Sequence, residues 1–146
     1  LKVKKKIDEE GRRNRSKINL NEKKKVEERA IKCTKEYYEN LGYTCTSVEE
    51  DNKGWDLEVE KGYTKLLVEV KGLSQSFISV MLSRNEYEKM KLNKESYRLS
   101  VVTNCLDQSN NPPINIFSYI EEQDAWFDQN ENKLMIEEIV AARCEL

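Results

Sequence analysis

The stretch from Gly54 to Gly72, GWDLEVEKGYTKLLVEVKG, restricts the fold of this chain more than any other part of the sequence. Its second half is an apolar, strand-like run, and side chains in a strand alternate between two faces. Glu69 and Lys71 therefore share a face with Leu67, while the aliphatic residues between them point to the opposite face. The pattern predicts a β-hairpin whose second strand carries a carboxylate and an ammonium group on one face.

The turn of this hairpin decides where Asp56 lies. If Lys61 and Gly62 form a two-residue turn, Asp56 joins the same face, one diagonal step from Glu69. Two carboxylates and a lysine then converge, which is typical of a metal-dependent nuclease site built on a hairpin. The alternative is that the acidic and basic residues of this face form an ordinary ion pair on a solvated sheet, which contributes little to stability.

The chain has no histidine among its 146 residues, and this limits the chemistry that it can perform. Ser-His-Asp and Cys-His arrangements, histidine general bases and imidazole zinc sites are all excluded. Any catalysis must use carboxylates, lysine, tyrosine, hydroxyl groups or a metal ion. Oxygen ligands suit hard cations such as Mg²⁺ or Mn²⁺, which bind one or two carboxylates together with a substrate phosphate. The composition therefore favours phosphoryl chemistry if the chain is an enzyme.

The length and composition of the chain predict a single soluble domain. Charged residues make up 36% of the chain, and the mean hydropathy is −0.82. No apolar run approaches the roughly 20 residues that span a bilayer, and no signal-like segment opens the sequence, so we expect a cytoplasmic protein without membrane contact. The four cysteines show no CxxC spacing, and we expect reduced thiols rather than a zinc ribbon.

Charge is distributed unevenly along the chain. Residues 1–32 carry thirteen Lys and Arg against six Asp and Glu, whereas residues 111–146 carry two against eight. The basic blocks suit contact with phosphates, but a solvated linker explains them too. We favour the linker, because the first sixteen residues lack apolar periodicity. We expect residues 1–18 to form a flexible basic linker or arm and residues 19–146 to form a single domain.

A helical pattern begins at Asn19, which with Glu22 resembles a capping box. On a helical wheel, the apolar stripe that runs from Val26 to Leu41 includes Glu27 at its widened edge but leaves Glu28 outside. Two interpretations of Glu27 stay open. Either it is a third acidic group directed at the site, or it lies near the helix start, reaches water and interacts with the helix dipole.

The remaining chain alternates between strand and helix signals. Ser83 with Glu86 forms a second capping box, and capping explains both residues as the start of a helix that ends near residue 91. Expected strands besides the hairpin are 43–48, 77–82, 97–103, 114–120 and 133–142, the last of which also fits a helical pattern. Trp126 and Phe127 are expected to anchor in the core. This order predicts an α/β fold with a mixed central β-sheet flanked by helices.

Several features, taken in order, resemble the NO VEIN C-terminal domain family. They lie within residues 24–120 and are the helix with Glu27, then Gly54-Trp55-Asp56, Glu69-Val70-Lys71-Gly72, Ser83-x-Asn85-Glu86 and Tyr97-Arg98-Leu99. That family belongs to the wider PD-(D/E)XK restriction-endonuclease-like superfamily, and Trp55 occupies the place of the proline in that name. The resemblance implies a restriction-endonuclease-like core for the domain at residues 19–146.

The resemblance also implies a function, a metal-dependent DNA endonuclease that hydrolyses phosphodiester bonds. Asp56 and Glu69, with the Val70 carbonyl, would hold Mg²⁺ or Mn²⁺. Glu27 would assist directly or through water, and Lys71 would orient or help to deprotonate the attacking water. Members of the family are often attached to helicases or to restriction and phage-defence proteins, so the implied partners are DNA and the other domains or subunits of such a system. Cutting both strands needs two sites, which favours a homodimer or paired domains.

In an alternative interpretation the chain has the nuclease fold but little nuclease activity. A near-neutral domain lacks the strong basic patch that is usual for tight DNA binding. The chain would then be a catalytically weak module that binds nucleic acid, or one whose acidic C-terminal third docks on a partner protein.

Overall fold

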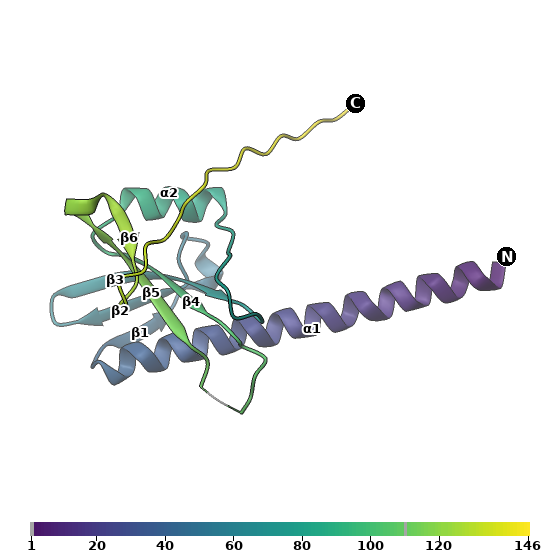
Figure 1. Ribbon diagram of the computed structural model, residues 1–146, viewed down its shortest axis with the longest axis horizontal. Helices are drawn as coiled ribbons and strands as arrows, with labels where there is room; N and C mark the ends of the chain where they lie inside the picture. The colour runs from purple at the N-terminus through teal and green to yellow at the C-terminus, as the bar shows by residue number, and fades with distance from the viewer. Residues whose placement is uncertain (1, 110) are drawn as a thin grey trace.

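The computed structural model describes residues 2–109 and 111–146, with side chains from Asn19 onward. The elements, in chain order, are α1 (Lys2–Asn40), β1 (Thr44–Ser47), the 3-10 turn η1 (Glu49–Asp51), β2 (Leu57–Lys61), β3 (Thr64–Gly72), α2 (Arg84–Leu92), β4 (Tyr97–Val102), β5 (Ile114–Ile120), the 3-10 turn η2 (Glu121–Gln123) and β6 (Ala125–Phe127). One helix lies on each side of the sheet (Figure 1). The expected α/β fold with a mixed sheet between helices is confirmed.

The strands follow one another across the sheet in the order β1-β2-β3-β4-β5-β6. Neighbouring strands are antiparallel except for β3 and β4, which are parallel. A parallel pair needs a crossover connection, and here the segment that contains α2 supplies it. This topology puts β3, the strand with Glu69 and Lys71, in the interior of the sheet.

The two faces of the sheet carry separate apolar cores. Val26 and Ala30 of α1 pack with Val68 and Val70 on one face. On the other face, Met90 of α2 packs with a second cluster, whose buried members are Tyr97, Leu99, Val101, Phe117 and Trp126. The expected alternation along β3 is therefore confirmed. The expectation that Trp126 belongs to the core is confirmed as well.

The hairpin turn differs from the expectation by one residue. Lys61 pairs with Thr64, so the two turn residues are Gly62 and Tyr63 rather than Lys61 and Gly62. Gly62 has a φ of +60°, a conformation that glycine adopts without the steric cost that a side chain brings. The shift leaves the faces unchanged, because it moves the register by two residues.

The boundary of the first helix was predicted wrongly. Asn19 lies inside α1, which begins at Lys2, and so it does not cap a helix there. Lys, Arg and Glu are good helix formers even where no apolar stripe marks the helix in the sequence. The use of residues 1–18 as a linker or phosphate-binding arm stays a prediction.

Two expected strands are absent from the described part of the chain. Residues 77–82 have no strand assignment: Phe77 and Met81 are 67% and 66% exposed, while Ile78, Val80 and Leu82 pack against the core on the α2 side. The segment therefore alternates in burial, as a strand would, but it covers one face of the sheet without pairing with a strand.

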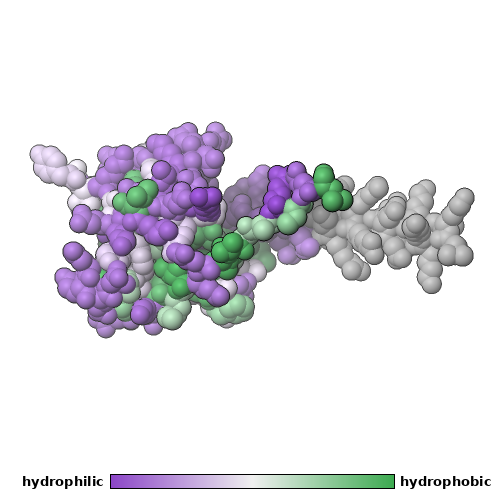
Figure 2. Space-filling view, turned by 90° about the horizontal axis from the view of Figure 1, so that it is seen from above, coloured by the Kyte–Doolittle hydropathy of each residue, from purple (hydrophilic) through white to green (hydrophobic). Residues whose placement is uncertain are grey.

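Residues 133–142 form neither a strand nor a helix, apart from one isolated bridge between Lys133 and Phe127. Leu134 packs against the core, but residues 135–146 are all exposed. In Figure 2 this projecting segment carries apolar and charged residues side by side. The expected strand or helix at residues 133–142 is therefore absent, and Glu138 makes contacts to Tyr87 and Lys91 of α2 from an exposed position.

The state of the cysteines and the hydropathy of the helices were also predicted from the sequence. The four cysteines are free, as the missing CxxC spacing led us to expect. None of the described helices has an apolar stretch long enough to cross a bilayer.

Candidate functional site

Asp56, Glu69 and Lys71 lie together on the α2 side of the sheet. Asp56 directly precedes β2, whose first residue Leu57 pairs with Val68, and its charge acts on both Glu69 and Lys71. The Lys71 Nζ atom lies 3.3 Å from Glu69 Oε1. The three side chains that the sequence predicted to converge are therefore close together.

The Asp56 carboxylate is held against the middle of β3. Its backbone N–H donates to the Val68 carbonyl at 2.9 Å, and its Oδ2 accepts a hydrogen bond from the Val70 N–H, also at 2.9 Å. Burial raises the pKa of Asp56, and the charge of Glu49 adds to the rise, although the Val70 hydrogen bond opposes it. The orientation of this acid is thus set by the strand itself.

Glu69 is the most strongly perturbed acid of the site. It is 3% exposed, in the middle of the sheet. Burial, followed by the nearby charges of Asp56 and Glu86, raises its pKa to about 9, although Lys71 opposes the rise. Negative charge is therefore incompletely neutralised at this position.

Lys71 is held by two carboxylates. Its Nζ donates to Glu86 Oε1 at 2.9 Å, in addition to the Glu69 contact. Burial lowers the pKa of Lys71, but the bonds and charges of Glu86 and Glu69 outweigh burial and raise it. The side chain is consequently ionised at neutral pH.

Glu86 also contacts this cluster, although the sequence favoured capping over a functional role for it. The predicted capping box is confirmed: the Ser83 side chain accepts from the Glu86 N–H, and Glu86 Oε1 accepts from the Ser83 N–H at 2.9 Å. Burial raises the pKa of Glu86, but the bonds from Ser83 and Lys71 outweigh this effect and lower it. The Ser83-x-x-Glu86 pattern was the available signal, and it does not show that the same oxygen also reaches Lys71.

The loop that precedes Asp56 is fixed from α2 and β4. The hydroxyl group of the buried Tyr97 donates to the Gly54 carbonyl at 2.9 Å, and Asn85 Nδ2 donates to the Asn52 carbonyl at 3.3 Å. Gly54 has a φ of +96°, and a Cβ there would lie 2.5 Å from Lys89 Cγ. Sequence reasoning placed Tyr97 and Asn85 among the family landmarks, without a contact for either.

Glu27 lies outside this cluster. The buried residues of α1 follow a four-residue spacing through Val26, Ala30, Thr34 and Tyr38, and Glu27 is exposed beside this narrow line. The helix also begins at Lys2, so Glu27 is far from its start, contrary to the dipole interpretation.

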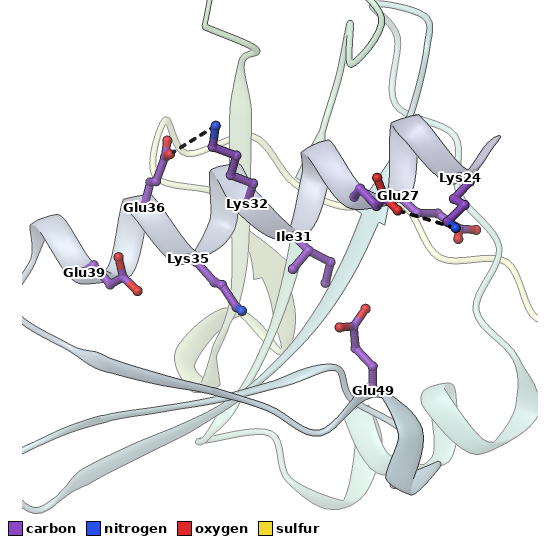
Figure 3. A pocket seen from close by; sticks show the side chains of 9 residues that line it. Lys24, Glu27, Ile31, Lys32, Lys35, Glu36, Glu39 and Glu49 are labelled. Carbon is purple, nitrogen blue, oxygen red and sulfur yellow. Dashed lines mark ion pairs between the residues drawn. The ribbon is translucent and has the colours of Figure 1, made fainter. Parts of the chain in front are cut away.

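Glu27 instead lines an open groove of about 530 Å³ between α1 and η1. In Figure 3, Glu49 of η1 points toward the helix that carries Glu27 and Ile31. The structure therefore brings Asp56, Glu69 and Lys71 together and places Glu27 in the groove.

The cluster offers few protein ligands for a metal ion. Within the part of the chain that the structure describes, no group of three or more Asp, Glu or Cys side chains is arranged to hold a metal ion. Asp56 and Glu69 supply hard oxygen donors, and burial is the main cause of the raised pKa of each. Two carboxylates with water and a substrate phosphate suffice for Mg²⁺, so the residues fit that ion.

Comparison with known proteins gives one match. The family model described as "Protein NO VEIN, C-terminal" matches residues 26–117, which is more than half of the chain. The matched range includes α1 from Val26 onward, the hairpin, α2, β4 and part of β5. No curated protein and no solved structure matches the chain.

Proposed function

The chain belongs to the NO VEIN C-terminal family, and on that premise we propose that it is a metal-dependent DNA endonuclease module of the PD-(D/E)XK type. The observation that supports the proposal best is the convergence of Asp56, Glu69 and Lys71 on one face of the hairpin. An ion pair on a solvated sheet would be exposed, whereas Glu69 is 3% exposed and its pKa is raised to about 9. A buried acid with so little charge compensation is typical of a functional site.

Each residue of the cluster has a role in this proposal. Asp56 and Glu69 would hold Mg²⁺ or Mn²⁺, with the carbonyl of Val70, the residue after Glu69, as a third oxygen donor. The ion would supply Lewis-acid stabilisation of a phosphodiester oxygen and a water that loses its proton more easily. Lys71 is held in its charged form by two acids, so it suits stabilising negative charge on the phosphate rather than accepting a proton.

The biological setting forms part of the same proposal. The substrate is DNA, and the module works within a larger restriction or phage-defence protein, to which the resemblance noted above points. Cleavage of both strands would use two copies of the site, which a homodimer would provide.

A cleavage assay tests the proposal. The protein is incubated with supercoiled plasmid or single-stranded DNA and with Mg²⁺ or Mn²⁺, and then with excess EDTA. We expect metal-dependent nicking that Asp56→Asn and Lys71→Ala each reduce by roughly 10²–10³-fold, because the first removes a charged ligand of the metal ion and the second removes positive charge that stabilises the phosphate. Glu58→Gln is the matched control: Glu58 belongs to the same hairpin, but it pairs with Lys53 and Lys65 outside the cluster.

The same assay decides the role of Glu27. If Glu27→Ala cleaves like the wild type, the exposed groove position has no part in the reaction. Intact DNA with the wild type and every variant, under all metal conditions, would contradict the nuclease proposal. A salt titration of DNA binding would then separate a nucleic-acid-binding module from a protein-docking one.

A further inference from the structure

One carboxylate oxygen joins the start of α2 to the strand that carries the site. Glu86 Oε1 accepts the Ser83 N–H at 2.9 Å and the Lys71 ammonium at 2.9 Å. Glu86 occupies the third helical position, where the capping box fixes its side chain against the helix end. The Glu86 oxygen that accepts from Lys71 is therefore also fixed by a backbone hydrogen bond of the capping box.

Lys71 needs such a partner to have a defined position. A lysine side chain is a flexible four-carbon stem with a rotatable ammonium group, and it is not preorganised by its own geometry. Glu69 is two residues away on the same strand and reaches the ammonium from the sheet side at 3.3 Å. Glu86 reaches it from the helix side, so the ammonium lies between two elements that are distant in sequence.

Capping alone does not account for this arrangement. A capping box requires an acceptor oxygen at the third position, and either Glu or Gln provides one. It does not require that the oxygen also contact a lysine on the opposite layer. Glu88, on the same helix, has no such double role: it is exposed and forms an ion pair with Arg84, four residues earlier.

We propose that Glu86 is a positioning residue that holds the Lys71 ammonium beside Asp56 and Glu69, so that α2 sets the geometry of the site on β3. This rests on the proposed nuclease function for its kinetic consequence. Its structural content, an ammonium group fixed by Glu86, stands independently of that function.

The central variant is Glu86→Gln, which keeps an acceptor oxygen for the Ser83 N–H and removes the charge that faces Lys71. We expect the single-turnover cleavage rate at saturating DNA to fall by about 10- to 100-fold, because a displaced catalytic group costs that much. The KM for DNA and the melting temperature should change little. Glu88→Gln is the matched charge control on the same helix and should cleave like the wild type.

A second control separates positioning from helix stability. Asn93 caps the other end of α2, where its side chain donates to the Lys89 carbonyl at 2.9 Å. Asn93→Ala should lower the melting temperature and leave the cleavage rate unchanged. If Asn93→Ala slowed cleavage as much as Glu86→Gln does, Glu86 would act through helix stability and the proposal would be overturned.

A structural measurement distinguishes failure of this inference from failure of the nuclease proposal. The ¹⁵N order parameter of the Lys71 ammonium is measured in the wild type and in Glu86→Gln without DNA or metal. A rigid ammonium in the wild type that becomes mobile in the variant supports positioning, even if no DNA is cleaved. Equal mobility in both proteins overturns the positioning role, even if the wild type proves to be an active nuclease.

Discussion

Glu69 occupies a position where an ionised carboxylate is costly. It is almost fully buried, the charge of Asp56 is near it, and Lys71, its one ion-pair partner among the described residues, is shared with Glu86. Its pKa is consequently raised from 4.5 to about 9. A protein without a use for this acid would be more stable with a neutral side chain of the same shape.

The cost of ionising Glu69 in the folded state predicts how the stability of the protein depends on pH. The folded state holds a proton on Glu69 more tightly than the unfolded state does, so the free energy of unfolding falls as pH rises between about 4.5 and about 9. Below this window the acid is protonated in both states, and no penalty arises. Between pH 5 and pH 8 we expect the metal-free protein to lose on the order of 3 kcal/mol, to which Asp56 adds in the same direction. Urea unfolding across this pH range measures the effect.

Glu69→Gln provides the comparison for that measurement. The variant keeps the shape of the side chain and removes its titration, so most of the decline between pH 5 and pH 8 should disappear. Mg²⁺ should stabilise the wild type at pH 8 more than it stabilises the variant, because the ion favours the ionised acid. A wild type and a variant with the same pH dependence would show that Glu69 titrates normally in the folded protein.

At the scale of elements, the crossing of α1 over β3 depends on Gly72. A Cβ at this position would lie 2.7 Å from the Val26 carbonyl oxygen and 2.9 Å from Ala30 Cβ. Gly72 therefore serves close helix–strand packing rather than an unusual backbone angle. This explains in physical terms why a glycine directly follows the Glu-x-Lys pattern on β3.

Gly72→Ala should consequently destabilise the protein. The added methyl group meets backbone and helix atoms that cannot move aside as a flexible side chain can, so we expect a loss of about 1–3 kcal/mol. Urea unfolding measures it, with Ser74→Ala as the control because Ser74 is exposed in the next loop. Equal stability of Gly72→Ala and the wild type would mean that α1 does not approach β3 this closely.

The same scale shows why some elements were predictable and others were not. Alternation along β3 correctly assigned Glu69 and Lys71 to one face, because that pattern follows from strand geometry alone. The turn was placed one residue too early, because Lys61-Gly62 and Gly62-Tyr63 both put the glycine in a two-residue loop. Residues 77–82 alternate like a strand, yet they pair with no strand, and Ile78, Val80 and Leu82 pack instead against the core on the α2 side.

At the scale of the whole molecule, the folded body ends near Leu134. Leu134 packs against the core on the α2 side, and its N–H donates to the Trp126 carbonyl at 2.8 Å. Beyond it, residues 135–146 are exposed, although Glu138 contacts Tyr87 and Lys91 on α2. Exposed polar contacts of this kind add little to stability.

A chain that stops after Leu134 should therefore fold as stably as the full chain. We expect the free energy of unfolding to change by less than about 1 kcal/mol, since no residue of the core is removed. Thermal unfolding of the two chains measures this, and a chain that stops after Phe127 is the control, because it loses Leu134 and the buried Asp128. A large loss on removal of residues 135–146 would show that this segment packs on the domain.

The sequence by itself determined the chemistry available and the face on which it lies. The absence of histidine excluded most catalytic arrangements, and strand alternation put Glu69 and Lys71 on one face of β3, since both follow from local covalent structure. The position of Asp56 depended in addition on the hairpin turn. Only the tertiary structure showed which further acid lies beside Lys71. Glu27 was selected from a helical wheel, but the contact of α1 with the sheet is narrow and leaves Glu27 exposed. Glu86 reaches Lys71 because the crossover between two parallel strands places the start of α2 over β3, and no local pattern encodes that distance.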